Sequence, residues 1–600
     1  MAITNEKAAP ESPTSAASTL TAPVIYQLTI SRFRGIKSLT WHPARGVNIV
    51  LGGGDVGKTT ILDAIGLLLS PTNAANLSDS DYYLREVASE FTIEAIVSLP
   101  LAGAMNQQFK TSWPWVWDGS DAVVPSIEAD GAATSEAVYR LRVRGTEDLE
   151  LAFEIVQPDG AADHLSVGLR RSIGLVRLSG DDRSDRDLRL VQGSALDRLL
   201  SDKTLRSRIA SELGKTDVQE RLTPEAKKAL TDLDATFRNQ TLPSGLDISI
   251  TGGPGASVAS LIGLMAQCES VRLPLVSWGA GTRRLAALAI AEQNQGEHPI
   301  VLVDEIERGL EPYRQRALLE KQQAGESQVF ITTHSPAAIS AASSAALWYV
   351  DHAGRIGLLD TAKTARHRTK DPDTFLSRLA IIGEGITEVS FTVSLLERAV
   401  GSSVRQYGIH ISDGGGHDAT IDLLESLGKA GLQFGGFVDN EDRHPQRWER
   451  IMKAQGDLLF RWKAGCTEHN IIGAVSDDSL EALLTDPENE LTGTRLRTLA
   501  DRLGVDEKDF ATVKARAGDR LKPLIIEAAT GAVPLDKIDE KKLYKSHAKM
   551  WFKSERGGRE LALKVFSLGL WPTFSAQLMP FCNAARKAVD LPAISDLNHE

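Results

Sequence analysis

The residues best suited to chemistry begin with a glycine-rich segment, Gly52–Thr59 (GGGDVGKT). It fits the G-x-x-x-x-G-K-[ST] pattern of a phosphate-binding loop. Its glycines let backbone N–H groups approach phosphate oxygens, and a helix that starts near Lys58 points its positive end at them. Lys58 is predicted to bind the β- and γ-phosphates, and the Thr59 hydroxyl is predicted to ligate Mg²⁺. We therefore expect the nucleotide to be bound by Gly52, Gly54, Gly57, Lys58, Thr59 and Thr60.

Two apolar runs farther along the chain end in residues that complete such a site. Ile300–Val303 ends in Asp304 and Glu305, and the run 329–333 ends in His334. Asp304 is predicted to hold magnesium, directly or through water, and Glu305 is predicted to polarise the attacking water. The order of these motifs predicts ATP hydrolysis.

A second group of carboxylates follows residue 380. Glu384 comes after the apolar residues 380–382, between two glycines, and is expected in the crevice where open α/β sheets bind ligands. Glu388 lies about one helical turn farther on and can face the same way. Asp439 and Glu441 follow the run 435–438. They occupy alternate positions of an extended segment, so they can converge on one cation.

These carboxylates would repel one another strongly without cations. Ligation by oxygen alone suits Mg²⁺ or Mn²⁺ and disfavours zinc. Two such ions about 3.5–4 Å apart are the usual device for phosphodiester cleavage. The alternative is that these residues are exposed loop acids. Glu468, in the segment 462–472 (WKAGCTEHNII), is either a further ligand or an exposed acid.

Hydrophobic periodicity predicts the elements that must position these residues. Helices are expected at 58–69 and 283–292, and strands at 24–30, 47–51, 91–99, 246–250, 300–303, 329–333 and 379–382. The charge-rich residues 183–240 predict a helical insertion. The polar and basic residues 361–373 predict a linker. Strands and helices then alternate to about 475, and the remainder is predicted to be mainly helical.

Length and composition restrict the remaining possibilities. A chain of 600 residues exceeds a single core, and its apolar and charged content is that of globular domains. The composition of residues 1–22 predicts a disordered tail, and the N-terminus does not have the pattern of a signal peptide. The sequence as a whole predicts no membrane span. Three scattered cysteines indicate a reducing, cytoplasmic location. The net charge of −12 argues against a general basic coat for nucleic acid, although a local basic groove can coexist with it.

The segment 277–284 (SWGAGTRR) precedes a predicted helix and lies between the phosphate loop and the Asp-Glu strand. Taken alone, it also fits a helix-capping turn. In this order it resembles the signature motif of ABC-type ATPases, where the signature of one subunit closes on ATP held by another. The resemblance implies a homodimer or higher oligomer with nucleotide contacts from Ser277, Gly279 and Gly281. His334 resembles the histidine of that class that senses the γ-phosphate. Arg34 resembles an N-terminal arginine near the nucleotide in SMC-like and RecF-like members.

The second group of carboxylates resembles the Toprim domain, with a strand, a glutamate turn and an acidic D-x-E at a later strand. The glycines at 414–416 resemble the turn after its intermediate strand. An ABC-type ATPase followed by Toprim is the arrangement of the OLD (overcoming lysogenization defect) family of nucleases, and the resemblance covers residues 24–475. The long C-terminal region and the D-x-E resemble the class 2 branch, which includes the nuclease subunit of Gabija-type phage defence. Members of that branch are encoded beside a UvrD-like helicase.

The resemblance implies an ATP-regulated, metal-dependent DNA endonuclease or nickase. It implies ATP and Mg²⁺ at the first site, two Mg²⁺ or Mn²⁺ at the second, and DNA and a UvrD-like helicase as partners. OLD nucleases also use a C-terminal lysine at the scissile phosphate, which we place at Lys553, with Lys545 and Lys549 as alternatives and a solvated basic face as the other interpretation. The expected catalytic residues are Glu305, Glu384, Asp439 and Lys553. The expected metal ligands are Thr59, Asp304, Glu384, Glu388, Asp439, Glu441 and Glu468.

The expected fold class is α/β: an ABC-type ATPase domain with a helical insertion, then a Toprim α/β domain with a mainly helical C-terminal region. The predicted bounds are 23–182 and 246–365 for the ATPase, 183–245 for a helical dimerisation insertion, and 374–600 for the Toprim and C-terminal regions. The alternative is an SMC/RecF-like ATPase whose Toprim domain is non-catalytic and binds DNA structurally. It lacks the long heptad arms of SMC proteins. A topoisomerase would need a tyrosine that attacks the DNA strand, and no such tyrosine is recognisable. A primase would need a nucleotide-polymerising module, which is also not recognisable.

Overall fold

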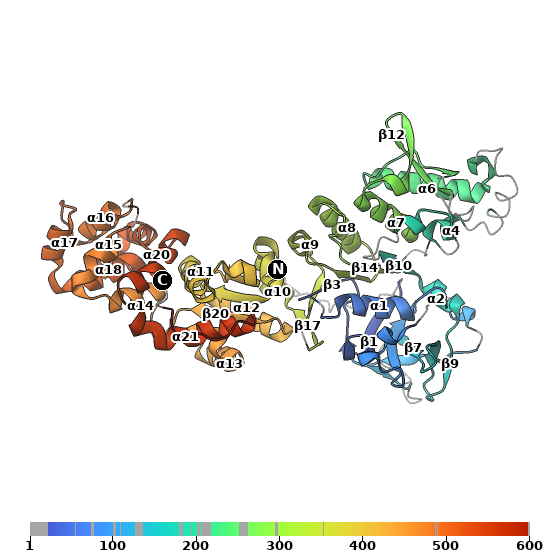
Figure 1. The fold of residues 1–600 in the computed structure, drawn as a ribbon, viewed down its shortest axis with the longest axis horizontal. Helices are drawn as coiled ribbons and strands as arrows, with labels where there is room; N and C mark the ends of the chain where they lie inside the picture. Colours follow the sequence, from blue (N-terminus) through green and yellow to red (C-terminus); the bar gives the residue numbers. More distant parts are fainter. Residues whose placement is uncertain are drawn as a thin grey trace, which may run out of the picture. The chain divides into compact units, whose positions relative to one another are not determined.

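The computed structural model describes residues 22–54, 56–73, 77–99, 104–108, 110–125, 136–178, 184–191, 194–200, 205, 218–250, 262–294, 298–351, 353–486, 488 and 490–597. The predicted disordered tail therefore falls, from residue 1 to 21, outside the described residues. Asp55 of the glycine-rich segment also falls outside them. The chain divides into a first unit, residues 1–49 and 57–333, and a second unit, residues 50–56 and 334–600 (Figure 1).

An antiparallel sheet forms one part of the first unit, drawn in blue in Figure 1. Its strands run in the order β2-β1-β4-β7-β5-β6, and β8 and β9 continue from β7. Their bounds are β1 Val24–Phe33, β2 Ile36–Trp41, β4 Phe91–Ser98, β5 Trp115–Trp117, β6 Ala122–Val123, β7 Ala137–Gly145, β8 Leu151–Val156 and β9 Ala162–His164. The strands predicted at 24–30 and 91–99 are confirmed.

Three parallel strands of the first unit carry the predicted nucleotide residues: β10 (Leu175–Leu178), β14 (Ile300–Val303) and β15 (Val329–Thr332). The central strand β14 pairs in parallel with both neighbours. Every residue of β14 and β15 is buried, as expected for parallel strands. The strand β3 (Val47–Gly52) leads through the glycine-rich segment into α1 (Lys58–Leu68). Asn48 of β3 donates to the carbonyl oxygen of Val329 over 3.4 Å, which places the start of β3 beside β15.

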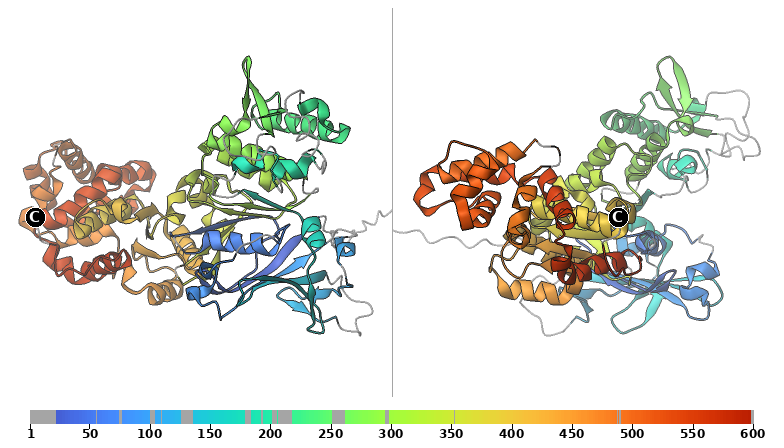
Figure 2. Two further views of the ribbon diagram at one scale, coloured as in Figure 1. Left: turned by 45° about the vertical axis from the view of Figure 1, so that its right-hand side comes forward. Right: turned by 60° about the vertical axis from the view of Figure 1, so that its left-hand side comes forward.

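The predicted helical insertion contains α3 (Ser184–Asp187), α4 (Ala195–Leu200) and α6 (Pro224–Asn239) among its described residues. The hydroxyl of Thr223 caps α6 by accepting from the backbone N–H of Ala226 over 3.2 Å, and Pro224 occupies the first helical position. These helices pack against α7 (Ala280–Asn294). The strands β11 (Asp247–Ile250), β12 (Ile262–Cys268) and β13 (Val271–Pro274) follow as an antiparallel sheet, whose β12–β13 hairpin projects in Figure 2. The first unit also holds α2 (Val167–Ile173) and α8 (Pro312–Ala324).

A four-stranded parallel sheet organises the second unit, in the order β19-β18-β20-β21. Its strands are β18 Leu379–Gly383, β19 Ile409–Asp413, β20 Phe434–Val438 and β21 Leu459–Arg461, and all three pairings are parallel. The helices between them are α11 Ile386–Val400, α12 His417–Ala430 and α13 Pro445–Gln455. The strand that follows β18 in the sequence, β19, pairs on one side of it, and the next strand, β20, pairs on its other side. The strand order therefore reverses at β18. Ligands of open α/β sheets bind at such a reversal, beyond the carboxyl ends of the strands.

The remainder of the second unit is helical, as predicted. Its helices are α14 Thr467–Ala474, α15 Leu480–Leu484, α16 Thr492–Leu503, α17 Phe510–Ala517, α18 Leu521–Thr530, α19 Lys541–His547, α20 Glu555–Ser567 and α21 Trp571–Ala588. One continuous hydrophobic core joins these helices to the parallel sheet. Within it the ring of Phe437 stacks on Phe460 at 4.7 Å and meets Trp462 and Phe581 edge-on. The helix α20 packs along α11, so the C-terminal region braces the helix that carries Glu388.

The prediction of a linker at 361–373 is wrong. Residues Thr361–Lys370 form the helix α10, which packs on α9 (Pro336–Ala341) and α12. The strands β16 (Ala346–Val350) and β17 (Ile356–Leu359) precede it as an antiparallel pair. The carboxylate of Asp360 caps α10 by accepting two backbone N–H groups, and basic residues in the last turn favour its negative end. His367 of α10 is buried and contacts the carbonyl oxygen of Asp413 at 3.0 Å. The polar composition of this segment favours a linker, although the segment forms a capped helix that packs on its neighbours.

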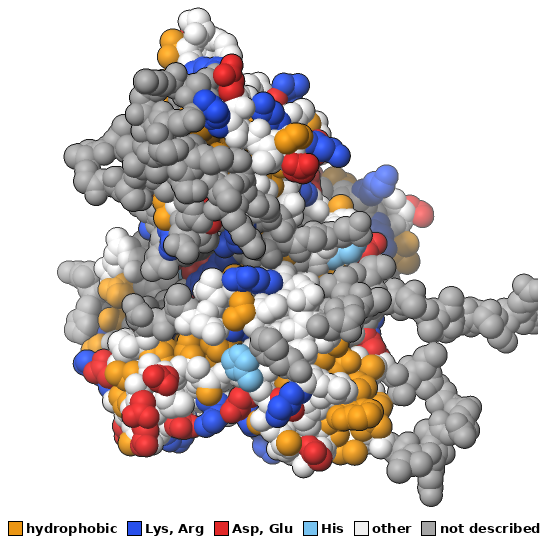
Figure 3. Space-filling view, turned by 90° about the vertical axis from the view of Figure 1, so that its right-hand side faces the viewer, with side chains coloured by type: hydrophobic (Ala, Val, Ile, Leu, Met, Phe, Trp, Pro, Cys, Tyr) orange, Lys and Arg blue, Asp and Glu red, His pale blue; other side chains and the backbone are white. Residues whose placement is uncertain are grey.

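The surface of the described residues has a mixed character. On the face drawn in Figure 3, acidic, basic and apolar side chains are interspersed over the lower part. Among the described helices, none is long and apolar enough to cross a membrane.

Candidate functional site

The glycine-rich segment has a local backbone geometry that requires glycine. Gly52 has a φ of 151°, and a Cβ atom there would lie 2.6 Å from the carbonyl oxygen of Val350. Gly57, with a φ of 96°, is the left-handed residue that precedes α1. Lys58 and Thr59 are the first two residues of that helix, and the Lys58 side chain is buried. The predicted sequence of strand, loop and helix is confirmed, and it is the setting that binds phosphate in this motif.

The carboxylate of Asp304 lies beside Thr59 although the two are far apart in the sequence. The Thr59 hydroxyl donates to Oδ1 of Asp304 over 3.1 Å, and Thr332 donates to the same oxygen over 2.6 Å. Asp304 is buried at the end of β14. A hydroxyl and a carboxylate held together at the start of a phosphate-binding helix are a suitable pair to share Mg²⁺.

Glu305 has an unusual backbone conformation. Its φ is 49°, in the left-handed region that side chains other than glycine seldom adopt. Its backbone N–H donates to the Thr332 hydroxyl over 2.8 Å, and its carboxylate remains 47% exposed, 3.7 Å from Arg308. Strained residues of this kind concentrate at functional sites. The carboxylate is open to solvent, as activation of a water molecule would require.

The sequence analysis missed the role of Arg284 on α7. Its buried guanidinium donates to the carbonyl oxygens of Glu305 and Arg308 over 2.7 Å each, and also to that of Asp304. Burial lowers the pKa of Arg284 to about 10. Arg284 therefore fixes the backbone around the predicted catalytic pair. The sequence signal that could have revealed this role is a basic residue near the start of the helix that precedes the Asp304-Glu305 strand.

The other predicted nucleotide residues have varied surroundings. Gly281 packs against the turn after β14, since a Cβ atom there would lie 2.0 Å from the carbonyl oxygen of Gly309. The Ser277 hydroxyl donates to the carbonyl oxygen of Pro274 over 2.7 Å, and Gly279 is exposed before α7. Thr60 is half-buried in the first turn of α1, and His334 is exposed directly after Thr333. Contacts of these residues with a nucleotide stay predictions.

Arg34 forms ion pairs within the first unit. Its guanidinium binds the carboxylates of Asp63 and Asp81, the latter over 3.0 Å. Asp63 also binds Arg177, so the four side chains form one network. The predicted contact of Arg34 with the nucleotide also stays a prediction.

Three predicted metal residues lie close together in the second unit, and of these Glu388 and Glu468 are buried and Asp439 is partly buried. Glu388 lies in the first turn of α11, Asp439 follows β20, and Glu468 begins α14. The Oδ1 atom of Asp439 accepts from the backbone N–H and the hydroxyl of Thr467 over 3.0 and 3.2 Å. The Thr387 hydroxyl donates to Glu468 over 3.0 Å. Glu468 is only 1% exposed, so its interpretation as an exposed acid is wrong.

Crowding of these buried carboxylates perturbs their ionisation. Burial, reinforced by the charges of Asp439 and Glu468, raises the pKa of Glu388 well above its ordinary value. Burial raises the pKa of Asp439 to about 8, with the charges of Glu468 and Glu384 acting in the same direction. Burial also raises the pKa of Glu384, and His417 opposes this shift. Such a cluster favours either protonation or a divalent cation.

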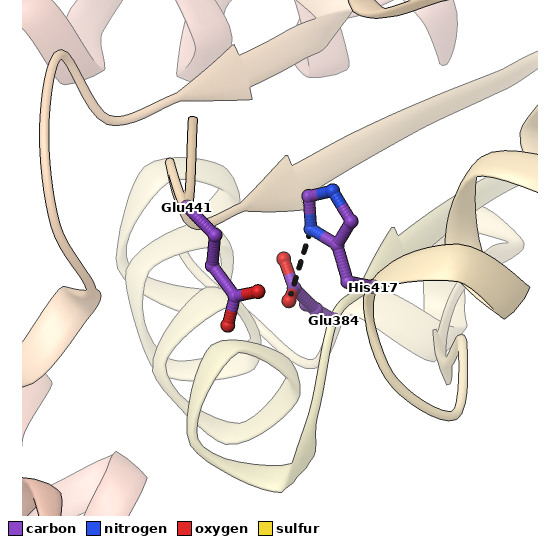
Figure 4. Close-up of side chains that lie close together, drawn as sticks. All are labelled: Glu384, His417 and Glu441. Carbon is purple, nitrogen blue, oxygen red and sulfur yellow. Dashed lines mark ion pairs between the residues drawn. The ribbon is translucent and has the colours of Figure 1, made fainter. Parts of the chain in front are cut away.

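Glu384 and Glu441 face each other in a neighbouring group, which includes a residue that the sequence analysis missed. The third member is His417, whose Nδ1 lies 3.4 Å from Oε1 of Glu384 (Figure 4). One possible donor atom of each residue lies within 4.8 Å of the others. His417 starts α12 directly after the predicted glycine turn at 414–416, which was the signal for it.

The donor atoms of the second unit fit divalent cations. The Oε2 atom of Glu384 is buried and has no hydrogen-bond partner among the described residues. A buried carboxylate oxygen without a donor is costly, and a cation would satisfy it. Carboxylate oxygens predominate, which suits Mg²⁺ or Mn²⁺. The residues that could hold such ions are Glu384, Glu388, Asp439, Glu441 and Glu468.

The C-terminal lysines differ from the carboxylates in being exposed. Lys545, Lys549 and Lys553 all lie at the surface. Lys553 is the one joined directly to a residue at the carboxylate cluster, because the carbonyl oxygen of Phe552 accepts from the Thr387 hydroxyl over 3.2 Å. That same hydroxyl donates to Glu468. The backbone next to Lys553 is thereby held near Glu468, and the role of the Lys553 side chain stays a prediction.

Comparison with known proteins identifies part of the first site. Residues 269–340 match the family described as "AAA domain, putative AbiEii toxin, Type IV TA system". This stretch includes Arg284, Asp304, Glu305 and His334. This part of the chain is therefore similar to an AAA-type ATPase domain. No curated protein sequence matches the chain.

Solved structures similar to the chain include ATPase heads, and each similarity covers about 57% of the chain. An Smc head bound to the C-terminal winged-helix domain of ScpA is 13% identical, with a TM-score of 0.37 and 99% of that chain covered. An Smc head with an extended coiled coil, bound to a ScpA domain derived from Pyrococcus furiosus, is 14% identical, with a TM-score of 0.36 and 98% covered. RecF with ATP is 15% identical, with a TM-score of 0.34 and 100% covered. These distant similarities carry no conclusion about function.

The match to the AAA-type ATPase domain ends at residue 340. Magnesium and ATP are the ligands that such a domain implies, and Thr59, Asp304 and Glu305 fit them by their geometry. The carboxylates of the second unit lie beyond the matched stretch. Their function must be inferred from their own chemistry.

Proposed function

We propose that this chain is an ATP-regulated, metal-dependent DNA endonuclease or nickase of the OLD family, in its class 2 branch. Its role would be in phage defence or DNA processing. The observation that carries the proposal is the grouping of the buried Glu388 and Glu468 with the partly buried Asp439 beyond the sheet. The reversal of strand order between β18 and β20 supports a ligand site there. We assign this part of the chain to the Toprim fold.

Each carboxylate has a distinct role in the proposed nuclease. Asp439 is held by Thr467 and interacts electrostatically with Glu384, Glu388 and Glu468, so it is the central ligand. Divalent ions held by these carboxylates would supply an activated water and neutralise charge on the phosphodiester. Glu384 and Glu441 extend the ligand set toward the surface, where the exposed Glu441 can meet DNA. Lys553 would stabilise charge at the scissile phosphate.

The ATPase domain would regulate cleavage and would not supply its energy. Lys58 binds the terminal phosphates, Thr59 and Asp304 hold Mg²⁺, and Glu305 orients the attacking water. Hydrolysis of a phosphodiester needs no ATP, and the carboxylates belong to a different unit of the chain. We also propose that Ser277, Gly279 and Gly281 contact ATP held by a second copy, with Arg34 and His334 near the phosphates. Further proposals are a homodimer, a UvrD-like helicase partner and a cytoplasmic location.

The decisive experiment uses the purified full-length protein and supercoiled plasmid DNA. Cleavage is measured with Mg²⁺ or Mn²⁺, with and without ATP, for the wild type and for Asp439→Asn. Asp442→Asn is the matched control, because Asp442 is an exposed acid on the same segment. We expect metal-dependent cleavage that Asp439→Asn removes and Asp442→Asn retains. Equal cleavage by the wild type and Asp439→Asn would reject the nuclease assignment.

The same experiment also tests a second candidate function, that of an ATPase that binds DNA without cleaving it. The family match lies within the ATPase part of the chain, at residues 269–340, so the alternative is an ATPase whose second unit binds DNA without cutting it. Such an SMC/RecF-like protein would hydrolyse ATP and bind plasmid DNA under all these conditions. It would leave the DNA intact with either metal.

A further inference from the structure

His417 stands out among the ionisable residues that the proposed nuclease does not use. It is only 6% exposed and starts α12, beside the equally buried Glu384 and the exposed Glu441. Figure 4 shows the imidazole and the two carboxylates turned toward one another from three different segments. One donor atom from each lies within 4.8 Å of the others.

Two buried atoms of this group lack hydrogen-bond partners among the described residues. They are Oε2 of Glu384 and Nδ1 of His417, and the two side chains are 8% and 6% exposed. Buried polar atoms are almost always satisfied by protein or water, so two neighbouring exceptions require a reason. A cation bound between them satisfies both at once.

The spacing of the Glu384 and His417 side chains fits shared coordination through Nδ1 and a carboxylate oxygen. Two ligand atoms that are each about 2.1 Å from a metal lie about 3.0 Å apart at a right angle and about 3.4 Å apart at a tetrahedral angle. The distance from Nδ1 of His417 to Oε1 of Glu384 is 3.4 Å. Glu441 is half-exposed and its 3.5 Å ion pair with Arg443 lies at the surface. Surface pairs of this kind contribute little, so Glu441 can turn toward the ion.

We propose that Glu384, His417 and Glu441 bind a divalent transition-metal ion through one nitrogen and two carboxylates, in preference to Mg²⁺. The inference rests on the proposed function for Glu384 and Glu441 and adds the imidazole ligand. Magnesium favours an oxygen environment and octahedral geometry, whereas imidazole nitrogen suits transition metals. Mn²⁺ and Co²⁺ accept mixed nitrogen and oxygen ligands. His417 thereby makes this position selective among ions that oxygen ligands alone would hardly distinguish.

The surroundings of His417 leave room for this role. The indole N–H of Trp448 lies 3.4 Å from Nε2 of His417, and an indole can only donate. Coordination through Nδ1 puts the ring proton on Nε2, so this contact must be given up. At 3.4 Å it is a long and therefore weak hydrogen bond, and metal binding must offset the loss of this partner for the buried indole N–H. The ring of His444 stacks on His417 at 6.0 Å and restricts the orientation of its plane.

Pulsed electron paramagnetic resonance can detect the proposed bond directly. Mn²⁺ is added to the nucleotide-free, full-length protein at one equivalent, and electron spin echo modulation from coordinated ¹⁴N is recorded. We expect the modulation in the wild type and its loss in His417→Gln. His444→Gln is the matched control, because His444 stacks on His417 but pairs with Asp418, which is not one of the three proposed ligands. An Asp304→Asn sample removes the Mn²⁺ that the ATP site could hold and should keep the modulation.

Calorimetry provides a second measurement that does not depend on catalysis. His417→Gln should weaken Mn²⁺ binding by about tenfold or more and leave Mg²⁺ binding within about twofold. Glu441→Gln, at an exposed position that tolerates substitution, should weaken Mn²⁺ binding similarly. Bound Mn²⁺ without ¹⁴N modulation in the wild type would overturn the inference, as would modulation that persists in His417→Gln or a wild type that binds no Mn²⁺.

These outcomes separate the inference from the proposed nuclease. A protein that shows the ¹⁴N modulation and cuts no DNA supports this metal site and rejects the nuclease. A protein that cuts DNA with Mn²⁺ and lacks the ¹⁴N modulation supports the nuclease and rejects this metal site.

Discussion

The hydroxyl of Thr59 donates to Oδ1 of Asp304 over 3.1 Å, across 245 residues of sequence. The contact joins the first turn of α1 to the end of β14, and Thr332 of β15 donates to the same oxygen. One magnesium ion between the two residues would replace the direct hydrogen bond. The pair is already arranged as an ATP site requires.

Substitutions in this pair and its neighbours should separate ATP binding from hydrolysis. Lys58→Ala should abolish ATP binding, because it removes the cation that pairs with the terminal phosphates. Glu305→Gln should retain binding and reduce hydrolysis by about 10²–10⁴-fold, because an amide cannot accept the proton of water. Glu320→Gln, an exposed acid on α8, is the control. Binding is measured by calorimetry and turnover by phosphate release. Normal turnover by Glu305→Gln would show that another residue activates the water.

Arg284→Met should destabilise the first unit and reduce ATP hydrolysis together. The substitution leaves buried carbonyl oxygens without a donor, each costing about 1–3 kcal/mol. Arg308→Met, at a half-exposed neighbour, should change stability by less than about 0.5 kcal/mol. Urea unfolding followed by fluorescence gives the free energies. Equal stability of the two variants would contradict the role of Arg284 as a support for the Asp304–Glu305 backbone.

In the proposed nuclease site, Asp439→Ala and Lys553→Ala should differ in metal affinity. Asp439→Ala should reduce plasmid cleavage by about 100-fold or more and weaken Mn²⁺ binding, because a ligand is lost. Lys553→Ala should reduce cleavage by about 10²–10³-fold and leave Mn²⁺ affinity intact, because an exposed lysine stabilises charge without ligating metal. ATP hydrolysis should survive in both. Full cleavage by Lys553→Ala would transfer the role to Lys545 or Lys549.

The helix α10 should be necessary for the stability of the second unit. A fragment 374–600 loses the contact of His367 with the carbonyl oxygen of Asp413 and the ion pair of Lys363 with Glu425. A fragment 344–600 keeps both. We expect the longer fragment to bind Mn²⁺ and cleave DNA without ATP, and to unfold at a higher temperature than the shorter one in calorimetric scans. Identical unfolding temperatures would restore the interpretation of 361–373 as a linker.

The ion cluster between α10, α12 and α13 should make the second unit sensitive to acid. Hydrogen bonds from Arg447 lower the pKa of Glu425 from its ordinary 4.5 to about 2. A depressed folded-state pKa adds stability that is complete above pH 4.5 and is lost as the pH falls toward 2. Glu425→Gln should therefore be less stable than wild type at pH 7, with a smaller difference at pH 3. Glu449→Gln, an exposed acid on α13, should show no such trend in urea unfolding.

The sequence by itself determined the elements whose signals are local. The phosphate loop is contiguous, and its glycines, lysine and threonine have fixed roles because the backbone alone forms the cradle. The strands that end in Asp304, Glu384 and Asp439 were predictable because buried parallel strands read as short apolar runs. The carboxyl ends of parallel strands meet at one edge of a sheet, so the polar residues that follow them were expected to gather.

Only the tertiary structure decided how those residues are grouped. It placed Asp439 with Glu388 and Glu468 and left Glu441 with Glu384 and His417, although Asp439 and Glu441 are two positions apart. It also buried Glu468 and made a packed helix of 361–370. These outcomes depend on partners far along the chain, such as Thr467 for Asp439. Sequence composition and residue spacing cannot reveal such a contact, because its second residue is brought into place only by the packing of separate helices and strands.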